Sequence, residues 1–310
     1  MYREGVSCGD MRNVACVILA AGKSTRMKSD VPKVLHPVCG VPILGHILNT
    51  VEFIRLRQVY VVAGVRYDLV RDFVGERAEV IRQYAPRGTG HALLQAQHAL
   101  KNHTGSVLVL CGDAPLLTAS TLKSLIQARV ESRASCSILS FDAESPSGYG
   151  RVIRDGAGFA QKIVEELNAA PREKKVREVN SGVYCFETRA LFGALRRVRP
   201  DRIKKEIYLT DVVQVLARGG RVKVWKTRRP EETLGINSRK DLALVTRIRK
   251  QAILDRHMTA GVTIVDEATT FIAEGVTIGP DTVIYPNTVI EGPSRIGARC
   301  RIGLFCADSS

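Results

Sequence analysis

The sequence predicts an α/β fold, a mostly parallel sheet with helices on both faces, followed by a short left-handed parallel β-helix. Two patterns in the 310 residues lead to this prediction. Up to residue 260, apolar runs alternate with amphipathic stretches, as in sheets whose parallel strands are joined by crossover helices. Beyond residue 260 the spacing of apolar residues changes, and an isoleucine recurs at every sixth position.

The strand candidates are short runs rich in valine, isoleucine and leucine. Most of them show no apolar–polar alternation, which is expected where both faces of a strand are covered. Because ligands of such sheets collect at the carboxyl ends of the strands, the segments after the first and fourth runs form the candidate binding edge. The predicted strands are 14–20, 58–63, 79–82, 106–111 and 136–141.

Amphipathic stretches between and after these runs predict the helices. Pro42 near the start of the first helix and Thr118 ahead of the fourth are typical helix-start signals. The predicted helices are 42–54, 68–74, 90–100, 118–132, 189–197, 209–217 and 238–257.

The six-residue period is typical of a left-handed parallel β-helix, in which each flat face repeats one inward-facing apolar position. The recurring isoleucines are at 272, 278, 284, 290, 296 and 302. Eight hexads make fewer than three triangular coils, so we expect a short stub with an exposed end unless it is capped or paired. The predicted division is an N-terminal tail at 1–13, a first domain at 14–237, a connecting helix at 238–260 and the β-helix at 261–310.

Composition argues against membrane and secreted classes. No stretch approaches 18 uninterrupted apolar residues, and residues 1–13 lack the apolar centre of a secretory signal. We therefore expect no membrane partner and a cytoplasmic location. The eight cysteines are scattered singly without a C-x-x-C pair, which favours buried reduced thiols over metal ligands or disulfides.

The charge is strongly basic and uneven. The formal net charge is +15, with an excess of +13 in residues 171–250 and −3 in residues 251–310. Such a basic segment could bind nucleic acid. Aromatic residues are not interleaved with the cations, however, and Trp225 is the only tryptophan. We therefore expect no nucleic-acid partner and a solvated basic face that attracts anionic nucleotides.

The most informative segment is 19–33, which reads LAAGKSTRMKSDVPK. A buried strand that ends in a turn of small residues presents main-chain N–H groups to a ligand, and the basic side chains that follow supply charge for a polyphosphate. A Walker A loop would need glycine where Val17 stands, and a dinucleotide fingerprint would need glycine where Ser24 stands. The alternative is a small-residue turn with scattered surface cations, and we favour a nucleotide site.

This segment resembles the L-A-A-G-x-G-T-R-M and P-K signature of sugar-1-phosphate nucleotidylyltransferases. It is most similar to the N-terminal uridylyltransferase domain of the family of bifunctional N-acetylglucosamine-1-phosphate uridylyltransferase/glucosamine-1-phosphate acetyltransferases, GlmU. Further blocks that match this family occur in the family's order, at Gln83, Gly88-Thr89-Gly90-His91, Gly112-Asp113-Ala114-Pro115-Leu116, Gly148-Tyr149-Gly150-Arg151, Ile163-Val164-Glu165, Asn180-Ser181-Gly182, Tyr208-Leu209-Thr210-Asp211 and Gly235-Ile236-Asn237.

The resemblance implies a Rossmann-like sheet of the nucleotide-diphospho-sugar transferase type. It also implies a Mg²⁺-dependent transfer of UMP from UTP to N-acetylglucosamine 1-phosphate, which yields the cell-wall precursor UDP-N-acetylglucosamine and pyrophosphate. Two polyanions must be aligned in such a transfer, so catalysis rests on positioning and on charge neutralisation rather than on a nucleophilic side chain.

The candidate catalytic residues are Arg26 and Lys33, which flank the small-residue turn and could span the triphosphate. Asp113 follows a strand and could hold Mg²⁺, and the resemblance implies Asn237 as its second protein ligand. Alone, Asp113 is also compatible with an ordinary turn and Asn237 with a helix N-cap. By resemblance, the nucleotide-binding residues are Leu19, Ala20, Ala21, Gly22, Gln83, Gly88, Thr89 and Gly112, and the sugar-binding residues are Gly150, Glu165 and Asn180.

Four positions depart from the family pattern. Ser24 replaces a glycine, Pro86 a glutamine, Cys111 a tyrosine and Leu167 a lysine. These changes leave the base and the sugar open, so the alternatives are a sugar-1-phosphate nucleotidylyltransferase that uses dTTP or CTP with another hexose 1-phosphate, and a sugar-nucleotide-binding or scaffold protein that has lost catalysis. Acetyltransferase activity is not expected. We expect a monomer or weak oligomer, with a trimer possible through the β-helix.

Overall fold

A mixed nine-stranded sheet forms the centre of the larger part of the molecule. The computed structural model describes residues 13–22, 25–201 and 205–303. The strands follow the order β11-β7-β10-β6-β1-β4-β5, with β8 and β9 attached beside β10. Their bounds are β1 Val14–Ala20, β4 Gln58–Ala63, β5 Glu79–Arg82, β6 Ser106–Cys111, β7 Cys136–Asp142, β8 Arg151–Arg154, β9 Ala160–Val164, β10 Glu178–Glu187 and β11 Val222–Lys226.

Most neighbouring strands along this order are parallel, as the sequence predicts. β1 pairs in parallel with β4 and β6, β4 with β5, and β11 with β7. β10 runs antiparallel to both β6 and β7, and the sequence analysis did not find this strand. Its pairing with β7 shifts register between Asn180 and Tyr184, so the regular spacing that would identify a strand is interrupted. β8, β9 and β11 were also missed.

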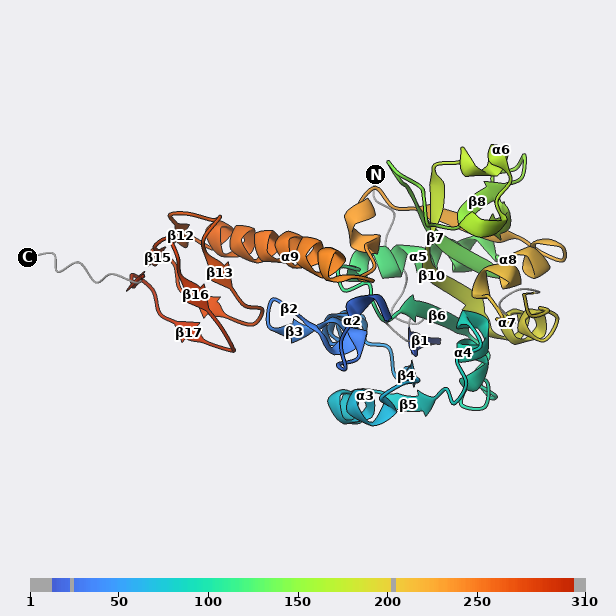
Figure 1. Cartoon of the computed structure of the whole chain (residues 1–310), viewed down its shortest axis with the longest axis horizontal. Helices are drawn as coiled ribbons and strands as arrows, with labels where there is room; N and C mark the ends of the chain where they lie inside the picture. The colour runs from blue at the N-terminus through green and yellow to red at the C-terminus, as the bar shows by residue number, and fades with distance from the viewer. Residues whose placement is uncertain (1–12, 23–24, 202–204, 304–310) are drawn as a thin grey trace, which may run out of the picture.

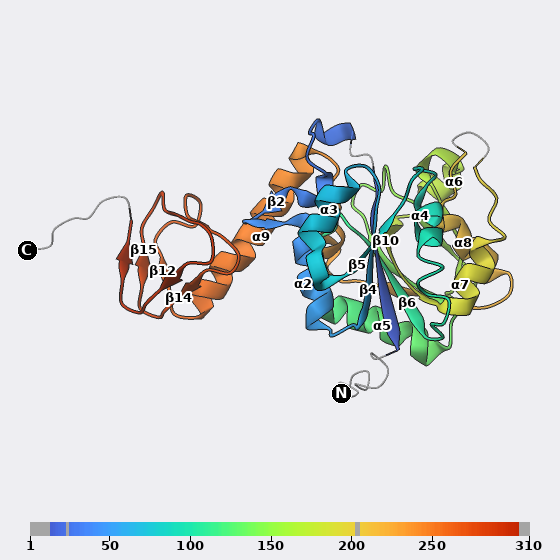
Figure 2. The same ribbon diagram turned by 90° about the horizontal axis from the view of Figure 1, so that it is seen from below.

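Helices cover both faces of the sheet (Figures 1 and 2). All but one of the predicted helices end within two residues of the prediction. The helix predicted at 90–100 is wrong beyond Gln95, where Ala96 N and Gln97 N bond three residues back and tighten the chain into turns. The α-helices are α2 Ile43–Phe53, α3 Tyr67–Val74, α4 Thr89–Gln95, α5 Ala119–Ser132, α6 Pro171–Lys174, α7 Thr188–Leu195, α8 Leu209–Ala217 and α9 Arg239–Thr259.

Short 3₁₀ helices and one two-stranded hairpin complete the sheet domain. The 3₁₀ helices are η1 Thr25–Met27, η2 Lys33–Leu35, η3 Gly75–Arg77, η4 Glu166–Asn168 and η5 Pro230–Thr233, and the hairpin consists of β2 Pro37–Val38 and β3 Val41–Pro42. η2 begins at Lys33, a predicted catalytic residue.

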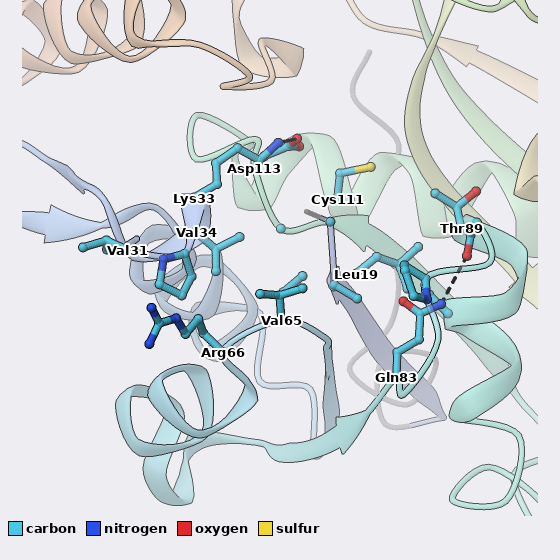
Figure 3. Close-up of a pocket in the computed structure, with 18 of the residues that line it drawn as sticks. Leu19, Val31, Lys33, Val34, Val65, Arg66, Gln83, Thr89, Cys111 and Asp113 are labelled. Atoms are coloured by element: carbon cyan, nitrogen blue, oxygen red, sulfur yellow. Dashed lines mark hydrogen bonds and ion pairs between the residues drawn. The ribbon is translucent and has the colours of Figure 1, made fainter. Parts of the chain in front are cut away.

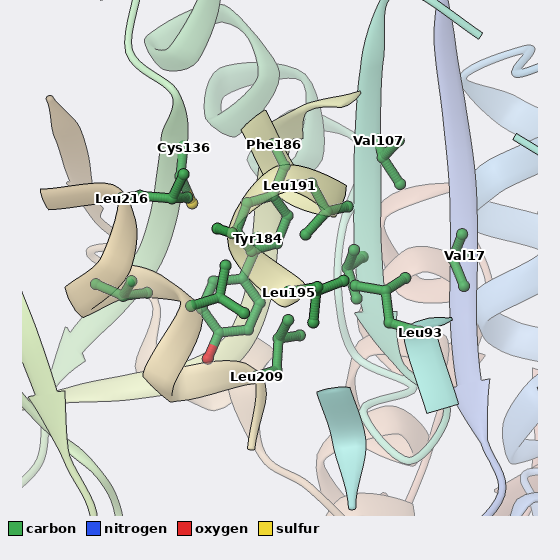
Figure 4. Close-up of a cluster of buried hydrophobic side chains, with 14 of the residues drawn as sticks. Val17, Leu93, Val107, Cys136, Tyr184, Phe186, Leu191, Leu195, Leu209 and Leu216 are labelled. Carbon is green, nitrogen blue, oxygen red and sulfur yellow. The ribbon is translucent and has the colours of Figure 1, made fainter. Parts of the chain in front are cut away.

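The core has two layers because both faces of the sheet are buried. Along β1, Ala15 and Val17 point to one face, and Cys16 and Ile18 to the other. On the first face, Tyr184 of β10 packs among leucines of α7 and α8, as Figure 4 shows. An apolar run without alternation is therefore the correct signature for β1, since alternate residues enter different core layers.

The predicted six-residue repeat forms parallel coils. Each strand from β13 onward ends at one of the predicted isoleucines, and β13–β16, β14–β17 and β15–β18 pair in parallel. Between β12 and β15 the first coil holds two more residues than the later coils do. The strands are β12 Thr263–Ile264, β13 Phe271–Ile272, β14 Thr277–Ile278, β15 Val283–Ile284, β16 Val289–Ile290, β17 Arg295–Ile296 and β18 Arg301–Ile302.

The β-helix is joined to the sheet domain by α9 and by the β2–β3 hairpin. One apolar cluster runs from Val38 through Val245 of α9 to Ile272 and Ile284. Glu274 adds two ion pairs to α9, with Arg249 at 2.8 Å and Arg256 at 3.1 Å. Among the described helices, none is both long and apolar enough to cross a membrane.

Candidate active site

Two cavities open at the carboxyl ends of β1 and β6. The first has a volume of about 510 Å³ and lies between the turn after β1, η2 and the segment that leads from β5 into α4 (Figure 3). The second, of about 720 Å³, lies between η4, β10 and the start of α8. Leu19, Thr89 and Cys111 line both cavities, so the two cavities adjoin.

Two glycines let the chain segments around the first cavity approach each other closely. Gly112 N donates to Leu19 O at 2.9 Å, and a Cβ on Gly112 would lie 2.9 Å from the same oxygen. Gly88 has a φ of +96°, and a Cβ there would lie 2.5 Å from Ile207 O. Any side chain at these two positions would push the loops apart, which explains glycine in both motifs.

Lys33, Asp113 and Asn237 meet at the edge of the first cavity. Lys33 Nζ donates to Asp113 Oδ2 at 2.5 Å and to Asn237 Oδ1 at 3.1 Å. Figure 3 shows Lys33 reaching Asp113 across the cavity's upper edge. Ile236 N donates to Asp113 O at 2.9 Å, which brings the segment before α9 next to the end of β6.

Asn237 is not the N-cap of α9, contrary to the alternative interpretation of its sequence position. Ser238 is the N-cap: it accepts from Asp241 N, while the Asp241 carboxylate accepts from the main-chain N–H groups of Asn237 and Ser238. This capping box satisfies the helix start without the Asn237 side chain. The Asn237 amide is therefore available to the site.

All eight predicted nucleotide-binding residues line the first cavity. They are Leu19, Ala20, Ala21, Gly22, Gln83, Gly88, Thr89 and Gly112. Pro86, one of the departures from the family pattern, lines it as well. Arg26 lies in η1 with an exposed side chain and lines neither cavity. Ser24 lies outside the described residues.

The Gln83 side chain is buried with both amide hydrogens directed at protein acceptors. Its Nε2 lies 2.9 Å from His91 Nδ1 and 3.4 Å from Gly88 O. Burial, together with the charge of Arg87, lowers the pKa of His91, so a neutral ring can accept this bond. The amide oxygen of Gln83 is left to accept a hydrogen bond from a ligand.

The predicted sugar-binding residues lie at or beside the second cavity. Glu165 and Asn180 line it, and Glu165 Oε1 accepts from Thr210 Oγ1 at 2.9 Å. Asn180 Nδ2 donates to Tyr184 Oη at 2.7 Å. Gly150 lies behind the lining: its carbonyl accepts from Asn180 N at 2.8 Å, and a Cβ there would come within 3.7 Å of the Glu165 carboxylate.

An ion pair that the sequence analysis missed lies beside this cavity and involves Glu166, which lines it. Arg151 is 2% exposed, and its Nη2 lies 2.6 Å from Glu166 Oε2. The same carboxylate accepts from Gly148 N at 3.3 Å. Arg151 closes one family block and Glu166 directly follows another, so the adjoining motifs gave the only sequence signal.

Among the described residues, the second cavity is lined by carboxylates and by no basic side chain. Glu165, Glu166 and Asp201 face it, whereas no lysine, arginine or histidine does so among the described residues. Burial raises the pKa of nearby Asp211, and the charges of Glu165 and Asp201 raise it further. Burial also raises the pKa of the Cys111 thiol to about 12, so this thiol is neutral at physiological pH.

No group of three or more histidine, cysteine or acidic side chains occurs within the described ranges that could hold a metal ion. Asp113 and Asn237 nevertheless provide two oxygen donors, and a cation, the Lys33 ammonium, already lies between them. Carboxylate and amide oxygens suit Mg²⁺, which usually keeps several waters and binds substrate phosphates. The residues present therefore fit a magnesium ion that completes its coordination from water and substrate.

Comparisons with known proteins agree with this arrangement. The profile of the MobA-like NTP transferase domain family matches residues 16–212, and that of the bacterial transferase hexapeptide (six repeats) matches residues 275–303. The first match spans both cavities and the second spans most of the β-helix.

The chain is also similar to curated proteins named bifunctional protein GlmU. It is 44% identical over 288 residues to the protein of Geobacillus thermodenitrificans, 47% over 277 residues to that of Pelotomaculum thermopropionicum, and 41% over 285 residues to that of Listeria monocytogenes. These matches cover 93%, 89% and 92% of this chain, and 63%, 61% and 62% of the relatives. The chain thus spans less than two thirds of the length of these relatives, and the resemblance drawn from its motifs is confirmed.

Proposed function

This chain belongs to the family of proteins with a MobA-like NTP transferase domain, and from that premise we propose that it transfers UMP from UTP to N-acetylglucosamine 1-phosphate. The products are UDP-N-acetylglucosamine and pyrophosphate. The observation that carries the proposal is the pair of adjoining cavities. The first is lined by loops of small residues beside Lys33 and Asp113, and the second by polar side chains that suit a sugar.

In the proposed reaction a phosphate oxygen of the sugar phosphate attacks the α-phosphorus of UTP. A new P–O bond forms as the bond between the α-phosphorus and the bridging oxygen breaks, and pyrophosphate leaves with that electron pair. Lys33 and Arg26 are proposed to neutralise the charge that develops on the phosphates. Asp113 and Asn237 would hold Mg²⁺, which supplies further neutralisation of the phosphate charge when bound.

Gln83 supports uracil as the base. Its amide hydrogens are directed to His91 and Gly88, so its amide oxygen would accept a hydrogen bond from the ring N–H of uracil. A base without that N–H would leave a buried acceptor unpaired, which is penalised. Thymine presents the same N–H, so dTTP is the closest alternative to UTP, and CTP ranks below it.

The sugar assignment rests on Glu165 and Asn180, with Gly150 positioned behind them. A carboxylate and an amide can bond the hydroxyl and acetamido groups of a hexosamine. Cys111 and Leu167, which line the same cavity, are the residues most able to alter this preference.

Pyrophosphate release with Mg²⁺ tests the proposal directly. UTP, dTTP, CTP and ATP would be combined with N-acetylglucosamine 1-phosphate and with glucose 1-phosphate. We expect strong turnover only with UTP and the acetamido sugar. Another preferred pair would move the assignment to a different sugar nucleotide. If folded protein releases no pyrophosphate with any pair, a sugar-nucleotide-binding or scaffold role is favoured.

The remaining features of the proposal are a cytoplasmic location and weak self-association. Six described cysteines are unpaired, which suits a reducing compartment. We propose a monomer or weak oligomer; a robust trimer in light scattering at micromolar protein would contradict this. Acetyl transfer is not included in the proposal, and thiol release from acetyl-coenzyme A with glucosamine 1-phosphate tests that separately.

The domain limits 14–237, 238–260 and 261–310 stay predictions.

A further inference from the structure

Lys33 occupies the space between the two proposed metal ligands. Its ammonium nitrogen is 2.5 Å from Asp113 Oδ2 and 3.1 Å from Asn237 Oδ1. We propose that Lys33 is a displaceable internal cation: it bridges these oxygens in the free protein and leaves them for the nucleotide's phosphates when a divalent cation binds. This inference rests on the proposed function, because it takes the metal site from it.

An ammonium group and a metal ion cannot share these two oxygens. Mg²⁺ lies about 2.0–2.1 Å from its oxygen ligands, so a metal bound by both would occupy the region where Nζ now lies. Two cations held about 3 Å apart would also repel strongly in a shielded site. Metal binding by Asp113 Oδ2 and Asn237 Oδ1 therefore requires that Lys33 give up both of its bonds.

Breaking the Lys33–Asp113 ion pair costs free energy unless the ammonium group pairs with another anion. The Lys33 side chain is 13% exposed and that of Asp113 is 23% exposed, so the ion pair is partly shielded from water. Lys33 also lines the first cavity, next to the turn that contains Gly22. A triphosphate bound there would offer Lys33 new partners. Metal and nucleotide binding should consequently strengthen each other, as linkage requires.

The oxygen ligands are held by contacts that do not involve Lys33. Asp113 O accepts from Ile236 N at 2.9 Å, and Asn237 N donates to Asp241 Oδ2 at 2.9 Å. The first bond keeps the two segments together when the lysine is replaced, and the second fixes Asn237 against the start of α9. Substitution of Lys33 can therefore test its charge without dismantling the site.

Metal affinity is the first measurement. Free Mn²⁺, followed by electron paramagnetic resonance, gives the Kd of the full chain without nucleotide. Lys33→Met keeps the length of the side chain and removes its charge, and we expect Mn²⁺ to bind at least about fivefold more tightly. Lys28→Met is the matched control, because it removes the same charge from an exposed residue in the same segment. Its Kd should stay within about twofold of the wild type.

Coupling is the second measurement. A non-hydrolysable UTP analogue should tighten Mn²⁺ binding more in the wild type than in Lys33→Met, because only the wild type has a lysine to relocate. Displacement itself is followed by NMR of lysine labelled at the ε-carbon, with the Lys33 signal assigned by its absence from Lys33→Met. Mg²⁺ alone should shift this signal as the site saturates, while the Lys28 signal stays in place.

The outcomes separate the inference from the proposed function. Metal binding that leaves the Lys33 signal unmoved and is equally tight in Lys33→Met would overturn the displacement. No Mn²⁺ binding by any of the proteins, even with the nucleotide analogue, would overturn the metal site and the displacement together. If the displacement is observed but no substrate pair is turned over, only the proposed uridylyl transfer is contradicted.

Discussion

At the scale of single residues, the candidate site depends on oxygen and nitrogen atoms brought together from distant parts of the sequence. Asp113 is the centre of this arrangement, since its side chain contacts Lys33 and its main chain contacts Ile236. The sequence indicated Lys33 by its place beside the small-residue turn and Asp113 by its place after a strand, and the resemblance added Asn237. It could not indicate that the lysine lies between the two oxygen donors, because that follows from the approach of η2, β6 and the start of α9.

The first prediction concerns the Asp113 carboxylate. Asp113→Ala removes the proposed metal ligand and the partner of Lys33, and should lower turnover at least about a hundredfold, as loss of a main electrostatic stabiliser does. Pyrophosphate release measures it. Asp30→Ala, on an exposed residue of the same cavity lining, is the control. Unchanged turnover in Asp113→Ala would refute the metal assignment.

The second prediction concerns sugar charge. Because the Glu165 carboxylate lines the second cavity and, among the described residues, no lysine or arginine does, a carboxylated sugar would meet like charge there. Glucuronic acid 1-phosphate should have a kcat/KM at least about tenfold below that of glucose 1-phosphate. Equal values for the two sugars would show that the carboxylates do not face the substrate. Glu165→Gln should reduce the difference in kcat/KM between the two sugar phosphates.

At the scale of elements, long buried strands were predictable and interrupted ones were not. β1 and β6 are buried on both faces, so nearly every residue is apolar and their bounds follow from composition alone. β10 carries Asn180, Ser181 and Gly182 in its middle, where its register with β7 shifts. Asn180 and Gly182 line the second cavity, and this run without apolar side chains hides the strand from any search for apolar spacing. The residues that line the cavity are therefore the reason why β10 could not be predicted from the sequence.

The third prediction tests how β8 and η4 are fixed around the sugar cavity. Glu166 binds Arg151 and Gly148 N, and thereby sets the positions of the neighbouring Glu165 and Gly150. Glu166→Gln should raise the KM for the sugar phosphate about five- to tenfold and leave the KM for UTP within about twofold. Glu166→Asp, which keeps the charge, should restore part of the loss.

A purely structural role for this ion pair would give a different result. Arg151 is nearly fully buried, so loss of its partner also costs stability. Each variant's thermal midpoint should therefore be measured beside its kinetics. Equal increases of both KM values, in proportion to the fall in the midpoint, would contradict a positioning role for Glu166.

At the scale of the whole molecule, the sheet domain and the β-helix share one apolar cluster and meet at Glu274. This residue follows β13 and pairs with Arg249 and Arg256 of α9, while its main-chain N–H donates to Cys39 O at 2.8 Å. The hexapeptide pattern predicted the coils because each one repeats the same inward position. The hexapeptide pattern could not predict the contact between the β-helix and α9, since that contact depends on the side chains of α9 that face the first coil.

The fourth prediction uses the charge of Glu274. Burial alone would raise the pKa of this carboxyl, but Arg249 and Arg256 outweigh burial and lower it below its ordinary value. A depressed folded-state pKa means that the ion pairs stabilise the fold above the unfolded pKa of about 4.3, and that this contribution is lost as pH falls through the folded value. Glu274→Gln should lower the thermal midpoint at pH 7 by roughly 2–6 °C, for a cost of about 1–2 kcal/mol.

The difference between the wild type and Glu274→Gln should shrink as the pH falls below about 4, since the wild-type carboxyl then becomes neutral too. Differential scanning calorimetry from pH 7 to pH 3.5 measures both midpoints. Glu291→Gln, on an exposed acidic residue of the β-helix, is the control and should leave the midpoint at pH 7 nearly unchanged. A midpoint difference for Glu274→Gln that stays constant across this range would show that packing, and not charge, joins the β-helix to α9.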